Sequence, residues 1–252
     1  MELAMQLRAA RAARTALVDA LPGPDDLGEA YRLAFDSLDD AQPAAFKLGG
    51  TNARTRAVFG VERPYFGPLN ADEVHESGAI LHPEAFINPV VEPEIVICFS
   101  GGWDARTDRR DPAVLAAGLD WVALGLEVPD TPLPNPAEAG VAALLTDRCA
   151  VGSLVIGDRL SPEQLLDLER GQVRMRLSDG RVSEAQDDCS PIGGVLASVA
   201  DCLQVLGECG QVLPAGCPVA TGGLAPALPI DKADRVVAEL AGQRVDFCFQ
   251  PG

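Results

Sequence analysis

Two glutamates, Glu92 and Glu94, are separated by a single residue inside the apolar segment 90–99. Side chains at positions i and i+2 of a β-strand point to the same face, so these two carboxylates should project together. Neighbouring negative charges repel each other, and a hard divalent cation that binds their oxygens removes the repulsion. The pattern is consistent with a metal site, but it also fits an edge strand whose acidic face lies in water.

Two other charged residues lie in apolar surroundings. Lys47 lies within segment 44–48, directly before a glycine pair, and Glu127 follows the apolar segment 121–126. A lysine in such a place can neutralise a substrate carboxylate or donate a proton, helped by a pKa that burial lowers. It can equally extend from the strand edge into solvent. A single acid at the end of a strand is usually solvated, so spacing alone assigns Glu127 no role.

The two histidines, His75 and His82, both lie in segment 60–88, which proline and glycine interrupt repeatedly. A catalytic base is conceivable there, but neither histidine has a partner at a recognised spacing. The sequence contains no P-loop, no G-x-G-x-x-G dinucleotide fingerprint and no G-x-S-x-G nucleophile elbow. The glycine pairs therefore favour turns or tight packing over phosphate binding.

The order of the secondary-structure signals indicates an α+β fold. Helical spacing dominates the first 40 residues, whereas short apolar segments bounded by glycine and proline dominate the rest. We expect helices at 2–20, 25–39, 51–59, 111–119, from 161 onward and at 191–207, and strands at 44–48, 90–99, 121–128, 149–156, 172–177, 181–185, 217–221, 234–239 and 244–249. The chain then divides into an N-terminal helical segment, 1–40, and a β-rich catalytic domain, 41–252, with a long irregular segment at 60–88.

Composition narrows the partners and the compartment. The 252 residues carry a net charge of −17 and no cluster of lysine and arginine, which argues against a nucleic-acid partner. No stretch approaches the roughly 20 apolar residues of a membrane span. Seven cysteines without a C-x-x-C pair favour reduced thiols, so we expect a cytoplasmic protein. Because an acidic protein repels small anions, a carboxylate substrate would need a local cation.

Short motifs occur in a fixed order along most of the chain. They are FKLGGTN at 46–52, VERPYFGPL at 61–69, VEPEI at 91–95, LEVPD at 126–130, TD at 146–147, VIG at 155–157 and ATGGLAP at 220–226. Their order and separations resemble the fumarylacetoacetate hydrolase superfamily, in particular its branch of 2-oxopent-4-enoate hydratases and 4-oxalocrotonate decarboxylases.

The resemblance implies a mixed β-sandwich or β-roll catalytic core preceded by helices. It also implies a site for Mg²⁺ or Mn²⁺ on Glu92, Glu94 and Glu127, with Lys47 as a catalytic lysine. In such a site, a small 2-oxo or 2-hydroxydienoic acid would bind the metal through a carboxylate oxygen and the adjacent oxo or enolate oxygen. The metal would then stabilise negative charge on the enolate. The implied activity is that of a lyase, either a hydratase or a decarboxylase, of the kind that acts in the catabolism of aromatic compounds.

The sequence departs from the family pattern at three places. Tyr65 stands where many hydratases and decarboxylases carry an acid, which makes it a second candidate catalytic residue and leaves open what replaces that acid. Asp147 and Arg148 replace an acid–asparagine pair, and GGLA at 222–225 lacks two family hydroxyls. Arg148 can clamp a second substrate carboxylate, or it can be solvated. The expected substrate-binding residues are Leu48, Asp147, Arg148, Gly223 and Ala225.

These departures leave other functions open. A C–C hydrolase or a 2-oxo acid tautomerase of the same superfamily would use the same metal, although a hydrolase needs a base and only the two histidines offer an imidazole. A non-catalytic subunit that binds the acid, or that stabilises an active paralogue, is a different class of function. Because members of the family commonly assemble, we expect a homo-oligomer or a complex with a related enzyme. In every case the expected ligand is a small carboxylic acid.

Overall fold

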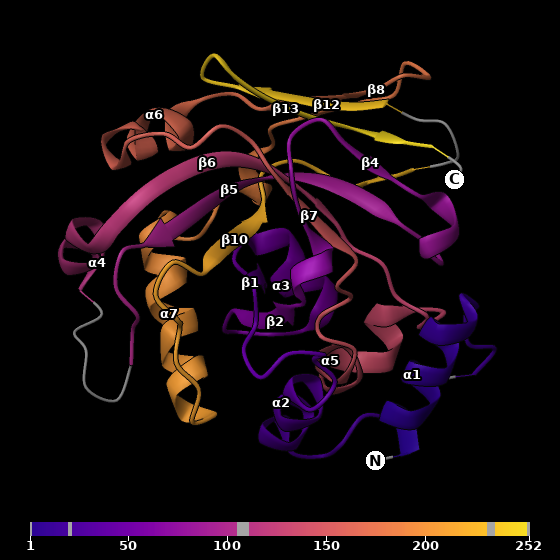
Figure 1. Ribbon diagram of the computed structural model, residues 1–252. Coiled ribbons are helices and arrows are strands. Elements are labelled where there is room, and N and C mark those ends of the chain that lie inside the picture. The colour runs from indigo at the N-terminus through magenta and orange to yellow at the C-terminus, as the bar shows by residue number, and fades with distance from the viewer. Residues whose placement is uncertain (1, 20–21, 105–110, 231–234, 251–252) are drawn as a thin grey trace.

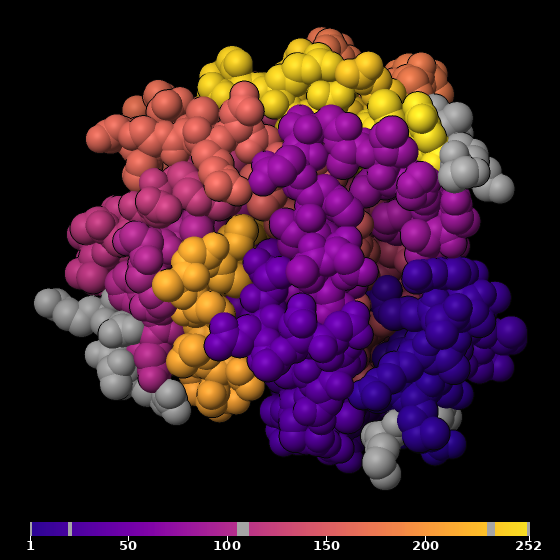
Figure 2. Space-filling view, viewed as in Figure 1, coloured from indigo at the N-terminus to yellow at the C-terminus, as the bar shows by residue number. Residues whose placement is uncertain are grey.

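The computed structural model describes residues 2–19, 22–104, 111–230 and 235–250. Two β-sheets stack on each other, and most of the helices lie on the other side of the larger sheet (Figure 1). The N-terminal helices and the C-terminal strands lie at opposite ends of the molecule (Figure 2). This arrangement of helices and curled mixed sheets confirms the expected α+β fold. The division into segments 1–40 and 41–252 stays a prediction.

The larger sheet contains the segments that carry the glutamates and Lys47. Its strands are β1 (Ala45–Gly49), β2 (Tyr65–Leu69), β3 (Val74–Glu76), β5 (Val90–Phe99), β6 (Leu119–Val128), β7 (Ser153–Ile156), β10 (Pro218–Gly223) and β11 (Leu228–Pro229). The order is β2-β1-β10-β5-β6-β7-β3, and β11 pairs with the first residues of β5. The β1–β10 and β3–β7 pairs are parallel, and the others are antiparallel. Strands far apart in sequence therefore become neighbours at the site.

The smaller sheet is antiparallel except at one edge. Its strands are β4 (Ala79–Leu81), β8 (Arg174–Leu177), β9 (Val182–Glu184), β12 (Arg235–Leu240) and β13 (Gln243–Phe249), in the order β4-β13-β12-β8-β9. The β4–β13 pair is the parallel one. β8 and β9 form the expected hairpin, and Gly180 in its turn has a positive φ of 94°.

The helices are short, and the first two are shorter than the expected helices at 2–20 and 25–39. The α-helices are α1 (Glu2–Ala13), α2 (Leu27–Phe35), α3 (Ala53–Phe59), α4 (Pro112–Gly118), α5 (Pro136–Thr146), α6 (Leu165–Arg170) and α7 (Val195–Glu208), and the 3₁₀-helices are η1 (Ala71–Glu73), η2 (Pro83–Ala85), η3 (Pro162–Gln164) and η4 (Asp187–Cys189). Asp26 and Asn52 cap the starts of α2 and α3 with their side chains. None of the described helices is long and apolar enough to cross a membrane.

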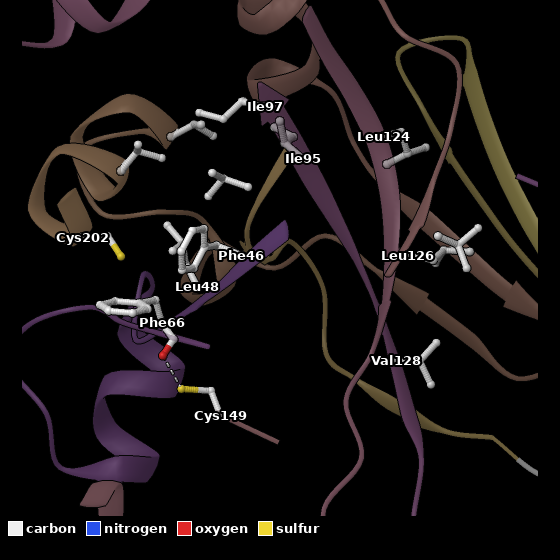
Figure 3. Packing of buried hydrophobic residues seen from close by; sticks show 14 of the residues in the cluster. Phe46, Leu48, Phe66, Ile95, Ile97, Leu124, Leu126, Val128, Cys149 and Cys202 are labelled. Atoms are coloured by element: carbon white, nitrogen blue, oxygen red, sulfur yellow. Dashed lines mark hydrogen bonds between the residues drawn. The ribbon is translucent and has the colours of Figure 1, made fainter. Parts of the chain in front are cut away.

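The alternation of side chains along β5 and β6 separates the core from the site. One face of these strands is apolar and packs in the main core, where residues of β12 and β13 also lie (Figure 3). The residues on that face are Ile95, Ile97, Phe99, Leu124, Leu126 and Val128. The opposite face carries Glu92, Glu94 and Val96 on β5. Because successive strand residues alternate, burial of the apolar face fixes the direction of the glutamates.

Three segments differ from the expectations. Segment 60–88 is not irregular, because it forms β2, β3 and β4. These strands are too short for an alternation of apolar and polar residues to be detected in the sequence. α5 was not expected, since prolines precede it and Gly140 interrupts its helical geometry with a φ of 83°. The first helix ends at Ala13 instead of residue 20. Arg14, the next residue, has a positive φ of 52°.

Candidate metal centre and active-site cleft

The three glutamates that the resemblance assigns to a metal lie together in the structure. Glu92 on β5 lies directly opposite Glu127 on β6, and Glu94 follows two residues later on the same face. One carboxylate oxygen from each can be chosen such that all three lie within 4.8 Å of one another. Gly125 lies opposite Glu94, and a Cβ on Gly125 would lie 2.6 Å from a methyl carbon of Val96. The antiparallel register therefore completes the cluster that the E-x-E spacing begins.

Two carboxylate oxygens of the cluster, Glu94 Oε1 and Glu127 Oε2, have no hydrogen-bond partner among the described residues. Glu94 and Glu127 are buried, with 0% and 2% of their surface exposed. Their other oxygens are used, because Glu94 Oε2 accepts the N–H of Gly222 at 2.8 Å and Glu127 Oε1 lies 2.7 Å from Lys47 Nζ. An unpartnered carboxylate oxygen is costly to bury, so the cluster calls for a further positive group.

Burial and repulsion by neighbouring charges raise the pKa values of Glu92 and Glu94. Burial raises the pKa of Glu92 to about 7; the charge of Glu127 acts in the same direction, while Lys47 opposes it. Burial, followed by the charges of Glu127 and Glu92, raises the pKa of Glu94 well above its ordinary value. A divalent cation would offset the lost hydration and the repulsion together. Since carboxylate oxygens are the hard ligands that Mg²⁺ and Mn²⁺ prefer, the residues present fit such an ion.

Lys47 on β1 is a buried cation beside the cluster, with 8% of its side chain exposed. Burial lowers its pKa, but the charge of Glu127, with a smaller contribution from Glu92, outweighs burial and leaves the pKa above its usual value. The expectation of a lowered pKa for Lys47 is therefore wrong, because the neighbouring carboxylates reverse the effect of burial. The ammonium is placed to balance the charge of Glu127 and to attract a substrate carboxylate.

A β-bulge in β10 presses the backbone of that strand against the glutamates. The register of β10 on β5 shifts between Ala220 and Gly223, and Gly222 has a positive φ of 103°, a region open to glycine. The bulge directs the N–H of Gly222 at Glu94. A Cβ on Gly223 would lie 2.3 Å from Oε2 of Glu92. Gly223 lines the cleft, and its missing side chain leaves room for the carboxylate of Glu92.

Replacing Gly223 with alanine should lower the affinity for Mg²⁺ by about tenfold or more, because the new methyl group must displace the carboxylate of Glu92. Isothermal titration calorimetry with Mg²⁺ measures the effect. Gly101→Ala is the matched control, because a Cβ there would have no atom within 4 Å. Equal affinities for two folded variants would show that the position of Glu92 does not depend on this gap.

Tyr65 on β2 borders the cleft close to the cluster. Its ring lies over the glycine pair, and a Cβ on Gly49 would lie 2.2 Å from the ring. The ring also meets Phe59 of α3 edge-on, with 6.0 Å between the ring centroids. Burial, more than any nearby charge, raises the pKa of Tyr65 above its usual value. A neutral phenol at this position can donate a hydrogen bond, but it cannot supply the charge of the acid that it replaces.

The cleft has a volume of about 530 Å³. Its wall includes α3 and the segment between β6 and α5, which contribute Thr55, Thr131 and Leu133 among others. Leu48 borders the cleft, and its side chain packs in the core beside Phe46 (Figure 3).

Three residues expected to bind substrate are not among the described residues that line this cleft. Ala225 is buried among core residues. Asp147 and Arg148 line a second cavity, of about 510 Å³, beside α1. The guanidinium of Arg148 binds Glu73 through contacts of 2.6 and 2.7 Å. Their place in the motif order suggested a binding role, but the chain uses both charges in structural ion pairs.

The ion pair of Asp147 connects α1 to the wall of the cleft. Arg11 donates to both oxygens of Asp147, at 2.7 and 2.8 Å, and to the carbonyl of Asp130 at 2.9 Å. Thr131 donates to the same carboxylate at 2.6 Å. Because Asp130 and Thr131 line the cleft, Arg11 helps to hold one of its walls in place.

Replacing Arg11 with alanine should lower the free energy of unfolding by about 3 kcal/mol, because it leaves the buried carboxylate of Asp147 without its cation. Urea unfolding followed by circular dichroism measures this change. Arg8→Ala is the control, because Arg8 is exposed and its hydrogen bond to the carbonyl of Asp36 is long, at 3.5 Å, so its loss should matter little. If the Arg11 variant is as stable as the Arg8 variant, the ion pair does not support the wall.

Thr51, Asn52 and Cys149 are among the polar residues that line the cleft and that the sequence did not single out as site residues. Asn52 accepts from the N–H of Thr55 at 2.9 Å and donates to the carbonyl of Gly223 at 3.1 Å, so it joins α3 to the bulge. Cys149 donates to the carbonyl of Phe66 at 2.8 Å (Figure 3). Thr51 and Asn52 carried a signal, since they end the FKLGGTN motif. No sequence signal marked Cys149. It lies in segment 148–150, whose backbone is left-handed although the segment contains no glycine.

The arrangement of strands and helices recurs in solved structures, although no family model matches the chain. 4-Oxalocrotonate decarboxylase from Pseudomonas putida G7, complexed with magnesium and adipate, matches with a TM-score of 0.83 and 23% identity over 98% of this chain and 96% of that chain. A putative fumarylacetoacetate hydrolase family protein from Yersinia pestis matches with a TM-score of 0.60 and 13% identity, over 81% and 92% of the two chains. The chain has the fumarylacetoacetate hydrolase fold.

Other proteins with the fumarylacetoacetate hydrolase fold also hold divalent metal. Fumarylpyruvate hydrolase from Pseudomonas aeruginosa, in complex with Mn²⁺ and pyruvate, matches with a TM-score of 0.60 and 18% identity over 82% of this chain and 89% of that chain. The magnesium and Mn²⁺ in these complexes agree with the expected cofactor.

Sequence relatives are similar over most of the chain. 2-Keto-4-pentenoate hydratase 1 of Dechloromonas aromatica is 27% identical over 196 residues, which cover 78% of this chain and 73% of the relative. 4-Oxalocrotonate decarboxylase of Pseudomonas putida is 26% identical over 196 residues, with the same coverage. The expected resemblance to the hydratase and decarboxylase branch is thereby confirmed.

Proposed function

We propose that this chain is a divalent-metal-dependent lyase, a hydratase or a decarboxylase, that acts on a small 2-oxo or 2-hydroxydienoic acid. The observation that carries the proposal is the cluster of Glu92, Glu94 and Glu127, two of whose buried oxygens lack a partner among the described residues. Lys47 lies against this cluster, and a cleft opens beside it. The hydratases and decarboxylases among its relatives support the reaction class.

Each group of the site then has a role. The three glutamates would hold Mg²⁺ or Mn²⁺, which when bound supplies a Lewis acid for negative charge on an enolate oxygen. Lys47 balances the charge of Glu127 and attracts the carboxylate of a substrate that the net charge of −17 would otherwise repel. Tyr65 borders the same cleft and can donate a hydrogen bond to the substrate or to a water molecule.

A C–C hydrolase or a tautomerase would use the same metal, but the position of the histidines disfavours a hydrolase. His75 lies on β3, paired with β7, and the ring of His82 lies 3.2 Å from the carbonyl of Gln250. Neither histidine is among the described residues that line the cleft. A hydrolase would therefore need another base to activate water.

A spectrophotometric assay tests the proposal. The protein is given Mg²⁺ and either 2-hydroxypenta-2,4-dienoate or 2-hydroxymuconate, and each reaction is repeated with excess EDTA and with the Glu94→Gln variant as controls. EDTA-sensitive addition of water to the first dienol identifies a hydratase, and EDTA-sensitive release of CO₂ from the second identifies a decarboxylase. A tautomerase would consume a dienol without either change. A folded, Mg²⁺-binding protein that consumes neither would contradict the lyase and favour a non-catalytic subunit.

We also propose that the protein works in the cytoplasm as a homo-oligomer, or in a complex with a related enzyme. The proposal rests on the resemblance to the fumarylacetoacetate hydrolase superfamily, whose members commonly form oligomers. Light scattering of the purified protein tests it, because an oligomer would have a mass that is a multiple of 26.4 kDa. A monomeric mass, and no binding to the related enzyme when the two are mixed, would contradict it.

A further inference from the structure

Apart from its charged residues, the cleft is lined mainly by apolar side chains. α3 contributes Phe59, the segment before α5 contributes Leu133 and Pro134, and α5 contributes Leu144. Val90, at the start of β5, adds another apolar side chain. The volume of about 530 Å³ lies within the range of roughly 300–1,000 Å³ of pockets that enclose drug-sized ligands. The cleft is therefore larger than a five-carbon acid needs, and its walls favour an apolar group.

The charges along the cleft do not suit a second carboxylate. Among the described residues that line it, Lys47 is the single lysine or arginine, and Glu127 already pairs with it. Asp130 adds a negative charge to the wall, held by the N–H groups of Ile87 and Asn88. Arg148, which was expected to clamp a second carboxylate, binds Glu73 beside the other cavity.

The arginines of α3 are also used elsewhere. Arg54 binds Asp188 and Gln186, and the Nε of Arg56 donates to the carbonyl of Gly50 at 2.8 Å. Neither arginine is among the described residues that line the cleft. A dicarboxylic substrate would thus bury its second carboxylate without a described cation, which is unfavourable.

We infer that the cleft binds a 2-oxo or 2-hydroxydienoic monocarboxylate with an extended apolar tail and discriminates against the dicarboxylate of the same length. The inference rests on the proposed function, because the glutamates and Lys47 fix the acid head of the ligand. It also favours a hydratase over a decarboxylase, since 2-hydroxymuconate is a dicarboxylate. The solved 4-oxalocrotonate decarboxylase, by contrast, is complexed with adipate, which is a dicarboxylate.

Equilibrium binding of unreactive acids tests the inference without any turnover. Isothermal titration calorimetry in the presence of Mg²⁺ compares 2-oxohexanoate with 2-oxoadipate, which have equal chain lengths and differ by one carboxylate, and with pyruvate, which lacks the tail. We expect 2-oxohexanoate to bind roughly tenfold or more tightly than 2-oxoadipate. It should also bind roughly tenfold more tightly than pyruvate, because three methylene groups leave water.

Two variants of α3 provide the matched comparison. Phe59→Arg places a cation in the wall of the cleft, at the end of the helix where a positive charge is favourable. Val58→Arg adds the same charge to the neighbouring residue, which is 53% exposed and is not among the residues that line the cleft. We expect Phe59→Arg to strengthen binding of 2-oxoadipate roughly tenfold relative to 2-oxohexanoate, and Val58→Arg to leave that ratio unchanged.

The possible results separate this inference from the proposed function. Equal or tighter binding of 2-oxoadipate by the unaltered protein would overturn the preference for a monocarboxylate and leave the metal-dependent lyase standing. Equal shifts in the two variants would also overturn it, because the effect would then come from net charge alone. If none of the three acids binds in the presence of Mg²⁺, the proposed function fails along with the inference.

Discussion

Replacing Glu94 with glutamine should weaken Mg²⁺ binding by roughly a hundredfold or more and abolish turnover, while the protein stays folded. Glu94 is fully buried, and one of its oxygens is unpartnered among the described residues, so the amide would remove an anionic ligand from the centre of the cluster. The fold should tolerate the change, because a neutral amide no longer meets the charges of Glu127 and Glu92. Calorimetric titration with Mg²⁺ and thermal melting measure the two effects.

The other two ligands and a remote acid complete this test. Glu92→Gln and Glu127→Gln should weaken Mg²⁺ binding in the same way, whereas Glu138→Gln, at an exposed position on α5, should not. Saturating Mg²⁺ should raise the melting temperature of the unaltered protein and of Glu138→Gln, because a ligand that binds the native state stabilises it. Unchanged affinity in all three cluster variants would remove the metal centre from the account.

Replacing Lys47 with methionine should lower kcat/KM about a hundredfold and at the same time leave Mg²⁺ binding as strong as before or stronger. The activity should fall because the site loses the charge that attracts the substrate carboxylate. The metal affinity should not fall, because Glu127 Oε1, which lies 2.7 Å from Lys47, becomes free of its competing partner. Steady-state kinetics and Mg²⁺ titration measure the two quantities on the same protein.

Lys47→Arg is the matched control for the charge. It keeps the cation beside Glu127 but changes its shape, so we expect it to recover part of the activity that the methionine variant loses. Full activity of Lys47→Met would exclude the lysine from the reaction. Weak Mg²⁺ binding by the same variant would show instead that Lys47 supports the cluster itself.

Much of the fold could be predicted because the buried strands have clear alternation. Segment 90–99 matched β5 at both ends, and its apolar side chains pack in the core on the face opposite Glu92 and Glu94. The two strands on either side of Gly180 and the starts of α2 and α3, to within two residues, were also predicted, since each depends on local chemistry. Predicting these features requires only residues that lie within a few positions of one another in the sequence.

The features that were missed depend on contacts between distant segments. β3 is three residues long and gains its stability from pairing with β7, which no local pattern reveals. The left-handed run 148–150 contains no glycine. Arg148 could be assigned to the cleft from motif order alone, and the three-dimensional structure was needed to show that Glu73 binds it. Local pattern therefore located the carboxylates, but not the residues that hold the cleft walls.

The most direct test of the metal centre is anomalous diffraction from crystals of this protein grown with Mn²⁺. The account predicts one strong anomalous peak at coordination distance from a carboxylate oxygen of Glu92, of Glu94 and of Glu127. A peak at any other group of residues, with the three glutamates unoccupied at saturating Mn²⁺, would contradict it.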